Sequence, residues 1–326
     1  MAKRNKRFKQ LKRMLRRPFE WLGIGLGYLI FTNLTRKGLL RACDFASRVM
    51  YRFDSRGRAN AHANLLVMFG KIDPKREELI VRRSYRNMAR TVGHAFWTCR
   101  NAVKRVRSAG EVDARAARFL AQNKPAVTVS GHIGCWEILS QLAFLEGHSM
   151  MSVAKDIGSK AMTKLLMKAR KSIGQEIIHA DGAFRSLMAG VKAGKSLGLL
   201  VDQNVRAADG GIWVRFFNQP VCVSAAPAFF AAKAKVPIVV AWSRPLNDGR
   251  YCCELINAYS CDQARDLWAM TQRCLKDLEG VIRRHPSCWV LNYHFFGRHS
   301  ASEDGAARLA ENEVKAAERA AKERAQ

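Results

Sequence analysis

The segment AVTVSGHIGCWE, residues 126 to 137, holds a histidine and a glutamate whose spacing suits proton-transfer chemistry. Ala126 to Ser130 is an apolar run preceded by a proline and ended by a glycine, which predicts a strand. His132 then falls in the turn after this strand and Glu137 in the first turn of a helix. On a straight helix the two side chains would diverge by about 140°, but the two glycines of the turn can bend it and let them converge.

A neutral imidazole held by a carboxylate is the arrangement that takes a proton from a hydroxyl group. We therefore predict that His132 is a general base and that Glu137 fixes its tautomer and stabilises the imidazolium. The spacing alone also admits a plainer interpretation. In that case a surface-loop histidine stands beside an ordinary first-turn glutamate, a residue type that helix N-termini favour.

The complete string favours the first interpretation. GHIGCWE, residues 131 to 137, resembles the His-x4-Asp/Glu motif of glycerolipid-type acyltransferases. It is most similar to the lipid A biosynthesis acyltransferases, which load a secondary acyl chain onto a Kdo-bearing lipid A precursor. That family commonly has Gly-His-aromatic-Gly-Asn-Trp-Glu. Ile133 and Cys135 depart from this pattern, but neither departure touches a group that would do chemistry.

Four further segments resemble the same family, in the same order along the chain. They are Val201-Asp202-Gln203, Gly211 to Phe217, Ala225 to Val240, and Pro286 to Trp289 with Asn292 and His294. The resemblance covers roughly residues 15 to 298, which is most of the chain. Asn218 replaces the glycine that usually follows the family's Phe-Phe pair. Asparagine tolerates a positive φ, so we expect the turn to persist.

The resemblance also implies substrate-binding residues. Arg170 best fits an arginine that contributes to activity and precedes the family's Asp-Gln motif, here Asp202 and Gln203. Arg170 would clamp a phosphate with two hydrogen bonds, and Asp202 would orient that phosphate or a substrate hydroxyl. Without the resemblance, a surface cation and a strand-end acid that caps a turn explain these residues equally well. Two further arginines are weaker phosphate candidates: Arg206 and Arg215.

The motif favours direct displacement on an acyl thioester over an acyl-enzyme. No GxSxG elbow is present, and Cys135 lies inside the motif rather than opposite the histidine, although it remains the alternative nucleophile. The loop amides around Gly134, at a helix N-terminus, are candidates for stabilising the oxyanion. The sequence has no CxxC pair and no HExxH, so neither a metal nor another cofactor is expected.

Composition indicates an anionic partner and a reducing compartment. The net charge is +29, well beyond what solubility needs, so nucleic acid, an acidic protein or anionic lipid is the expected class of partner. The nine cysteines are scattered without metal spacing, which is typical of reduced thiols in the cytosol. With 326 residues, 48% of them hydrophobic, the chain can bury the core of one large domain with an appendage.

The first 37 residues predict a membrane attachment. Residues 1 to 17 hold nine Lys or Arg and no acid, and eleven apolar residues follow, Trp21 to Phe31. No small-residue cleavage site follows the run, which argues against a signal peptide, and a full span needs about 20 residues. We expect a shallow anchor or a short tilted span on the cytoplasmic face of the inner membrane, in contact with anionic lipids. A buried helix with a basic tail is the plainer alternative.

Apolar runs alternate with helical periodicity from about residue 111 to 298, which predicts an α/β sandwich with a largely parallel or mixed sheet, like that of the glycerolipid acyltransferases. Sites in such sheets form beyond the carboxyl ends of strands, where His132 and Asp202 both fall, so we expect them in one cleft. The other expected strands are Met150 to Val153, Leu197 to Val201, Pro237 to Trp242 and Tyr251 to Ile256.

The predicted organisation is an anchor at 1–37, a basic helical region at 38–110, an acyltransferase domain at 111–298 and a charged helical tail at 299–326.

The sequence thus predicts an O-acyltransferase that moves a fatty acyl chain from an acyl carrier protein thioester to a hydroxyl of a lipid A precursor. Acyl carrier protein is acidic and suits the positive charge, although charge alone would admit acyl-CoA. One alternative is acylation of another lysoglycerolipid by the same residues. The other is a basic nucleic-acid-binding protein, which would share the basic helices of residues 75 to 107. It would need neither the apolar run nor the His-x4-Glu spacing, so nucleic acid is not the expected partner.

Overall fold

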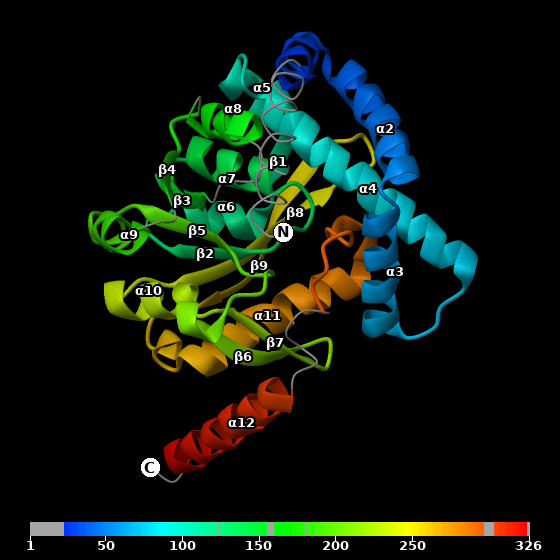
Figure 1. Cartoon of the computed structure of the whole chain (residues 1–326). Helices are drawn as coiled ribbons and strands as arrows, with labels where there is room; N and C mark the ends of the chain where they lie inside the picture. Colours follow the sequence, from blue (N-terminus) through cyan, green and yellow to red (C-terminus); the bar gives the residue numbers. More distant parts are fainter. Residues whose placement is uncertain are drawn as a thin grey trace, which may run out of the picture.

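The computed structural model of the chain describes residues 23–122, 124–154, 160–171, 173–179, 182–296 and 303–324. At the centre of these residues lies a seven-stranded mixed sheet (Figure 1). Its strands, in spatial order, are β1 (Gly110–Val112), β9 (Tyr251–Tyr259), β8 (Ile238–Pro245), β2 (Val127–Ser130), β5 (Ser196–Leu200), β3 (Met150–Ala154) and β4 (Glu176–His179). Neighbouring strands pair in parallel, except for β8 and β9, which pair antiparallel.

The five strands predicted from apolar runs are all present, with bounds shifted by a few residues. The sequence did not predict the edge strands β1 and β4 or the antiparallel hairpin of β6 (Gly211–Phe216) and β7 (Gln219–Ser224). β1 and β4 are only three and four residues long. Short edge strands have one neighbour and little room for an apolar pattern, so they leave a weak signal in sequence.

Helices cover both faces of the sheet, as the α/β sandwich prediction requires. One face carries α9 (Ala183–Lys192), α10 (Ala226–Ala234) and α11 (Leu267–Arg284), and the other carries α5 (Ala102–Ala109), α6 (Ala114–Leu120) and α7 (Trp136–Leu145). Helix α8 (Lys160–Lys171) packs beside β4 and contacts α4 (Pro74–Trp97). The mixed α/β fold class predicted from the sequence is therefore confirmed.

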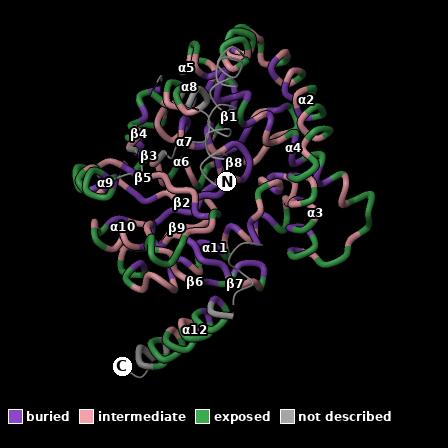
Figure 2. The backbone as a smooth tube through the Cα atoms, viewed as in Figure 1, coloured by how far each residue is buried: buried purple, intermediate pink, exposed green. Residues whose placement is uncertain are grey.

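Strand β8 shows why the central strands are apolar along their whole length. The side chains of Ile238, Val240 and Trp242 join the core beneath α10 and α11. Val239 and Ala241 join the second core, beneath α7. A strand buried on both faces needs apolar residues at every position, which gives a continuous run instead of an alternating one. Figure 2 shows the resulting concentration of buried residues in the central strands.

An N-terminal helical region lies along one side of this body (Figure 1). It consists of α2 (Arg36–Phe53), α3 (Ser55–Phe69) and α4, and α4 packs against both α2 and α7. Most of the region predicted to be basic and helical, 38–110, is helical in the structure, and Asp54 and Asp73 accept hydrogen bonds from the first turns of α3 and α4.

The predicted anchor lies partly outside the described residues, since residues 1–22 are not among them. Residues 23–33 are helical, and no helix within the described ranges is both long and apolar enough to cross a membrane. The end of the apolar run packs onto α4, where the rings of Phe31 and Phe96 lie 5.8 Å apart and the Trp97 indole donates to the Leu34 carbonyl. The last residues of the predicted anchor therefore belong to the folded body.

Helix α12 (Glu303–Arg324) forms most of the predicted charged tail and projects from the body at the C-terminal end (Figure 1). One side of the helix packs on β6 and β7, where the Leu309 side chain is only 3% exposed. Glu313 also pairs with Arg215 of β6 at 2.9 Å. The sequence did not predict these contacts, since one buried leucine does not make an apolar stripe.

Candidate active site

His132 and Asp202 meet because β2 and β5 are neighbouring parallel strands. Ser130 pairs with Leu200 in register, so both strands end at the same edge of the sheet and both residues follow within two positions. The imidazole Nδ1 lies 2.8 Å from Asp202 Oδ1. The two residues, which were expected to lie together beyond the carboxyl ends of their strands, are thus in direct contact.

Asp202 is buried and held by three hydrogen bonds. Besides the imidazole, it accepts from the His132 backbone N–H at 2.6 Å and from the Trp289 indole at 2.8 Å, both through Oδ2. Burial alone would raise the pKa of this carboxyl, but the His132 charge and these hydrogen bonds outweigh burial and lower the pKa. Gly131 permits this approach, since a Cβ there would lie 2.9 Å from Asp202 Oδ2. Asp202 therefore stays ionised beside the imidazole.

The geometry gives His132 the tautomer of a general base. With the Nδ1 proton donated to Asp202, the lone pair is on Nε2, and the side chain is 23% exposed. The Gln203 amide lies 3.4 Å from Nε2, and the Trp136 ring packs edge-on at 5.0 Å. Burial lowers the pKa of His132, but the Asp202 charge and hydrogen bond more than compensate, so the pKa lies above its ordinary value of 6.5.

Glu137 does not hold the imidazole, contrary to the prediction from its spacing. Its carboxylate instead forms a bidentate pair with Arg170, with Nε–Oε2 at 3.0 Å and Nη2–Oε1 at 2.7 Å. Glu137 lies in the first turn of α7, and the turn before the helix does not bend enough to undo the divergence of a five-residue offset. The β2–β5 register supplies Asp202 to Nδ1 in its place. The Glu137 charge still helps to raise the pKa of His132.

Arg170 is committed to this pair and is not an open phosphate clamp. Two of its donors bind Glu137, and the two side chains are only 17% and 4% exposed. Burial lowers the pKa of Arg170, but the charge and hydrogen bonds of Glu137 outweigh burial, so the pKa lies above its ordinary value. The pair ties the last turn of α8 to the first turn of α7. In this structure Arg170 thus joins α8 to α7 through Glu137, and phosphate binding by Arg170 stays a prediction.

The two weaker phosphate candidates also pair with carboxylates. Arg206 binds Asp209 three residues later and is 74% exposed. Arg215 binds Glu313 of α12. Within the described part of the chain neither arginine binds His132 or Asp202, so the structure does not bring them into this site.

Two of the loop amides around Gly134, which were predicted as candidates for stabilising the oxyanion, already have hydrogen-bond partners. The Gly134 N–H donates to the Cys288 carbonyl at 2.9 Å, and the next amide, of Cys135, donates to the Ser243 hydroxyl at 2.7 Å. Gly134 has φ = +63°, and a Cβ there would lie 1.8 Å from the Ser243 carbonyl oxygen. Only glycine fits this conformation and this close approach to β8.

Cys135 is not available as a nucleophile. Its side chain is fully buried, and burial raises the pKa of the thiol to about 12. A nucleophilic cysteine needs an exposed thiolate near neutral pH. The alternative of an acyl-enzyme on Cys135 is therefore disfavoured, and direct displacement remains.

Sequence reasoning missed the function of Trp289. The indole N–H donates to Asp202 Oδ2 and so helps to orient the carboxylate. The Trp289 ring packs against Phe216 and Phe217 of the β6–β7 hairpin and against Phe295. The hairpin turn needs positive φ at Phe217 (49°) and Asn218 (60°), so the turn predicted to survive the Gly-to-Asn departure is present. The family-like Pro286–Trp289 motif marked this residue, but no spacing in the sequence indicated its partner.

Helix α4 supports both loops of the site from outside the sheet. The Ser84 hydroxyl donates to the Trp289 carbonyl at 2.7 Å, and the Thr91 hydroxyl donates to the Gly134 carbonyl at 3.0 Å. These residues lie seven positions apart, two turns along one face of the helix.

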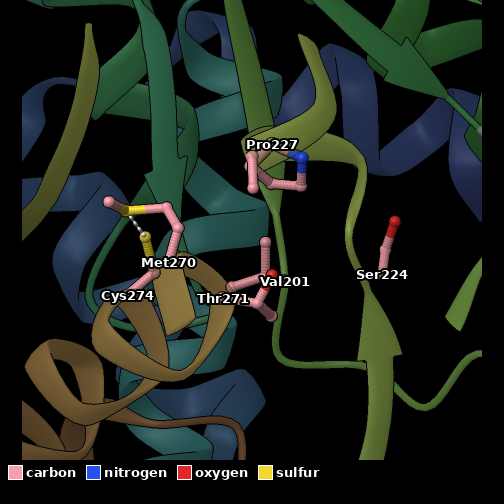
Figure 3. A pocket seen from close by; sticks show the side chains of 7 residues that line it. Val201, Ser224, Pro227, Met270, Thr271 and Cys274 are labelled. Carbon is pink, nitrogen blue, oxygen red and sulfur yellow. Dashed lines mark hydrogen bonds between the residues drawn. The ribbon is translucent and has the colours of Figure 1, made fainter. Parts of the chain in front are cut away.

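A small apolar cavity of about 10 Å³ lies between α10, α11 and the end of β5 (Figure 3). Val201, which lines the cavity, directly precedes Asp202.

A family model described as bacterial lipid A biosynthesis acyltransferase matches residues 5–310. The match covers nearly the whole chain, including both strands that carry His132 and Asp202. No curated protein matches the chain.

Proposed function

Because the chain belongs to the bacterial lipid A biosynthesis acyltransferase family, we propose that it transfers a fatty acyl chain from an acyl carrier protein thioester to a hydroxyl of a lipid A precursor. Family membership makes it an acyltransferase of lipid A biosynthesis and favours this reading over the nucleic-acid-binding alternative. The observation that carries the mechanism is the His132–Asp202 pair, in which Nδ1 lies 2.8 Å from Oδ1 and the carboxylate leaves Nε2 unoccupied.

In the proposed reaction, His132 Nε2 takes the proton of the acceptor hydroxyl while its oxygen attacks the thioester carbonyl. The new C–O ester bond forms and the C–S bond breaks, and the proton held on Nε2 passes to the departing thiolate. Asp202 stabilises the transient imidazolium and fixes the tautomer, as the carboxylate of a Ser-His-Asp triad does. Gln203, whose amide lies 3.4 Å from Nε2, is proposed to contact the reacting hydroxyl. Asp202 thus replaces Glu137 as the orienting carboxylate.

Loss of this chain from cells is expected to leave lipid A with one fatty acyl chain fewer, while phospholipids keep their composition. Mass spectrometry of both lipid classes, from cells with and without the gene, measures this directly. Unchanged lipid A together with altered phospholipids would instead support the alternative acceptor, another lysoglycerolipid, and would contradict the proposed one.

Salt is expected to raise the KM for the carrier-bound acyl donor. The chain carries a net charge of +29 and acyl carrier protein is acidic, and attraction between exposed charges is screened over about 8 Å at physiological ionic strength. Initial rates with acyl carrier protein and with CoA thioesters, each across a salt series, test this. Equal use of acyl-CoA, without any salt dependence, would count against the proposed donor.

We also propose that residues 1–37 hold the protein on the cytoplasmic face of the inner membrane. The apolar run Trp21 to Phe31 supports a hydrophobic wedge, and the nine basic residues before it support a polybasic patch on anionic lipid. Either signal alone is marginal, whereas the two together give stable attachment.

Deletion of residues 1–22 removes the basic residues but spares the segment that packs on α4. The deletion should shift the protein toward the soluble fraction, which fractionation of cell extracts measures. Complete retention on membranes after this deletion would show that the polybasic segment is not needed for attachment and would contradict the proposed two-part anchor.

A further inference from the structure

The outer face of α2 exposes aromatic side chains where a solvated helix would carry polar ones. Phe45, Val49 and Phe53 are 67%, 41% and 80% exposed. Their four-residue spacing places them in one stripe along the helix, since each step turns by only about 40°. Figure 2 shows exposed residues along α2, at the margin of the molecule. This stripe is therefore an apolar surface without a partner among the described residues.

The opposite face of α2 is already used. Leu39, Cys43 and Ser47 are buried on the side that packs against α4. Asp44, the one acidic residue of the helix, binds Arg90 of α4 at 3.0 Å. The inner face of α2 is therefore buried against α4, and its one acid is paired with an arginine. The outer stripe has no such packing partner among the described residues.

Three exposed arginines share the outer face with the stripe. Arg41, Arg48 and Arg52 are exposed and fall with the apolar side chains within an arc of about 140° of the helix surface. An arc of arginine and phenylalanine is complementary to an anionic lipid surface. The rings reach the boundary between headgroups and acyl chains, and the guanidinium groups meet phosphates. A second copy of α2 is a poor partner, because pairing would bring like charges together.

Exposed apolar side chains are also concentrated in this part of the chain. Of the fourteen exposed large hydrophobic residues within the described ranges, ten lie between residues 26 and 92. Three of them, Leu26, Leu29 and Ile30, lie on the helical segment that directly precedes α2. The α2 stripe thus continues, in sequence, a segment already expected to meet the membrane.

We propose that the outer face of α2, defined by Phe45, Val49, Phe53, Arg41, Arg48 and Arg52, docks onto the surface of an anionic bilayer. The helix lies in the interface and adds a second contact to the attachment by residues 1–37. The inference rests on the proposed function only in that the acceptor is a membrane lipid. Docking would hold the folded body in one orientation on the bilayer, which a single point of attachment does not do.

A tryptophan reporter tests this contact in the full chain. Phe53→Trp is mixed with phosphatidylglycerol-containing vesicles whose acyl chains are brominated, and its emission is compared with that of the parent chain. The added emission is expected to shift to shorter wavelength and to be quenched. Val314→Trp, at a 57% exposed position of α12, is the matched control and should add emission that bromine does not quench. Equal, unquenched emission from both positions overturns the proposal.

A second measurement uses removal of the rings. Phe45→Ser/Phe53→Ser is expected to weaken partitioning of the full chain onto anionic vesicles by about tenfold or more. The control, Val103→Ser/Val314→Ser, removes side chains that are 52% and 57% exposed on other helices and should partition like the parent. A change in self-association without a change in partitioning would assign the face to a second copy and overturn the proposal. Neither measurement needs turnover, so vesicle binding without acyl transfer would refute the proposed function alone.

Discussion

His132→Ala is expected to lower kcat/KM for acyl transfer by about 10²- to 10⁴-fold, the range that a positioned general base contributes. The side chain is partly exposed and belongs to no apolar core cluster, so the variant should fold. Turnover of purified protein, followed by mass spectrometry of the acylated lipid, measures the loss. Near-normal turnover by His132→Ala would remove this residue from the mechanism.

Cys135→Ala is the matched control for that experiment, three residues away in the same motif. The thiol is fully buried, with its pKa raised to about 12, so its removal should cost some stability and little activity. The two variants thus separate direct displacement from an acyl-enzyme. An acyl chain trapped covalently on Cys135 would reverse the assignment.

The sequence predicted which residues gather at the site better than it predicted how they pair. Apolar runs identified β2 and β5, and the rule that sites form beyond the carboxyl ends of strands brought His132 and Asp202 together. Which carboxylate binds Nδ1 depends on the rotation of the first turn of α7 and on the β2–β5 register. Neither can be read from local spacing, so the five-residue offset indicated Glu137 where the fold uses Asp202.

The supporting contacts were beyond sequence reasoning for the same reason. Trp289 is 87 residues from Asp202, and the Ser243 hydroxyl that takes the Cys135 amide comes from β8, 108 residues away. Such hydrogen bonds exist only once the sheet order is set. The partner of the Gly134 amide could not be predicted either, because the carbonyl that accepts from it belongs to a distant 3₁₀ turn, Pro286–Cys288.

Asp202→Asn is expected to reduce kcat by about 10²- to 10⁴-fold and to move the acidic limb of the pH profile. A general base must be neutral, so activity is lost as pH falls through the pKa of His132. In the parent chain the Asp202 charge holds that pKa above 6.5. Asparagine removes the charge and leaves burial, which lowers the pKa, so the limb should shift to lower pH. A profile of kcat/KM against pH for both proteins tests the shift, and an unmoved limb would contradict the pairing.

Glu137→Gln separates the two carboxylates, because the structure gives it a different defect. It leaves the Arg170 charge buried without a partner, and breaking a buried pair costs about 3–5 kcal/mol of unfolding free energy. Glu137→Gln/Arg170→Met removes the orphaned charge and should recover most of that stability. Because Glu137 contacts Arg170 and not the imidazole, folded Glu137→Gln should keep far more activity per molecule than Asp202→Asn. If it is instead as inactive as Asp202→Asn while its unfolding free energy is unchanged, Glu137 acts in the chemistry itself, and the predicted His132–Glu137 mechanism would be restored.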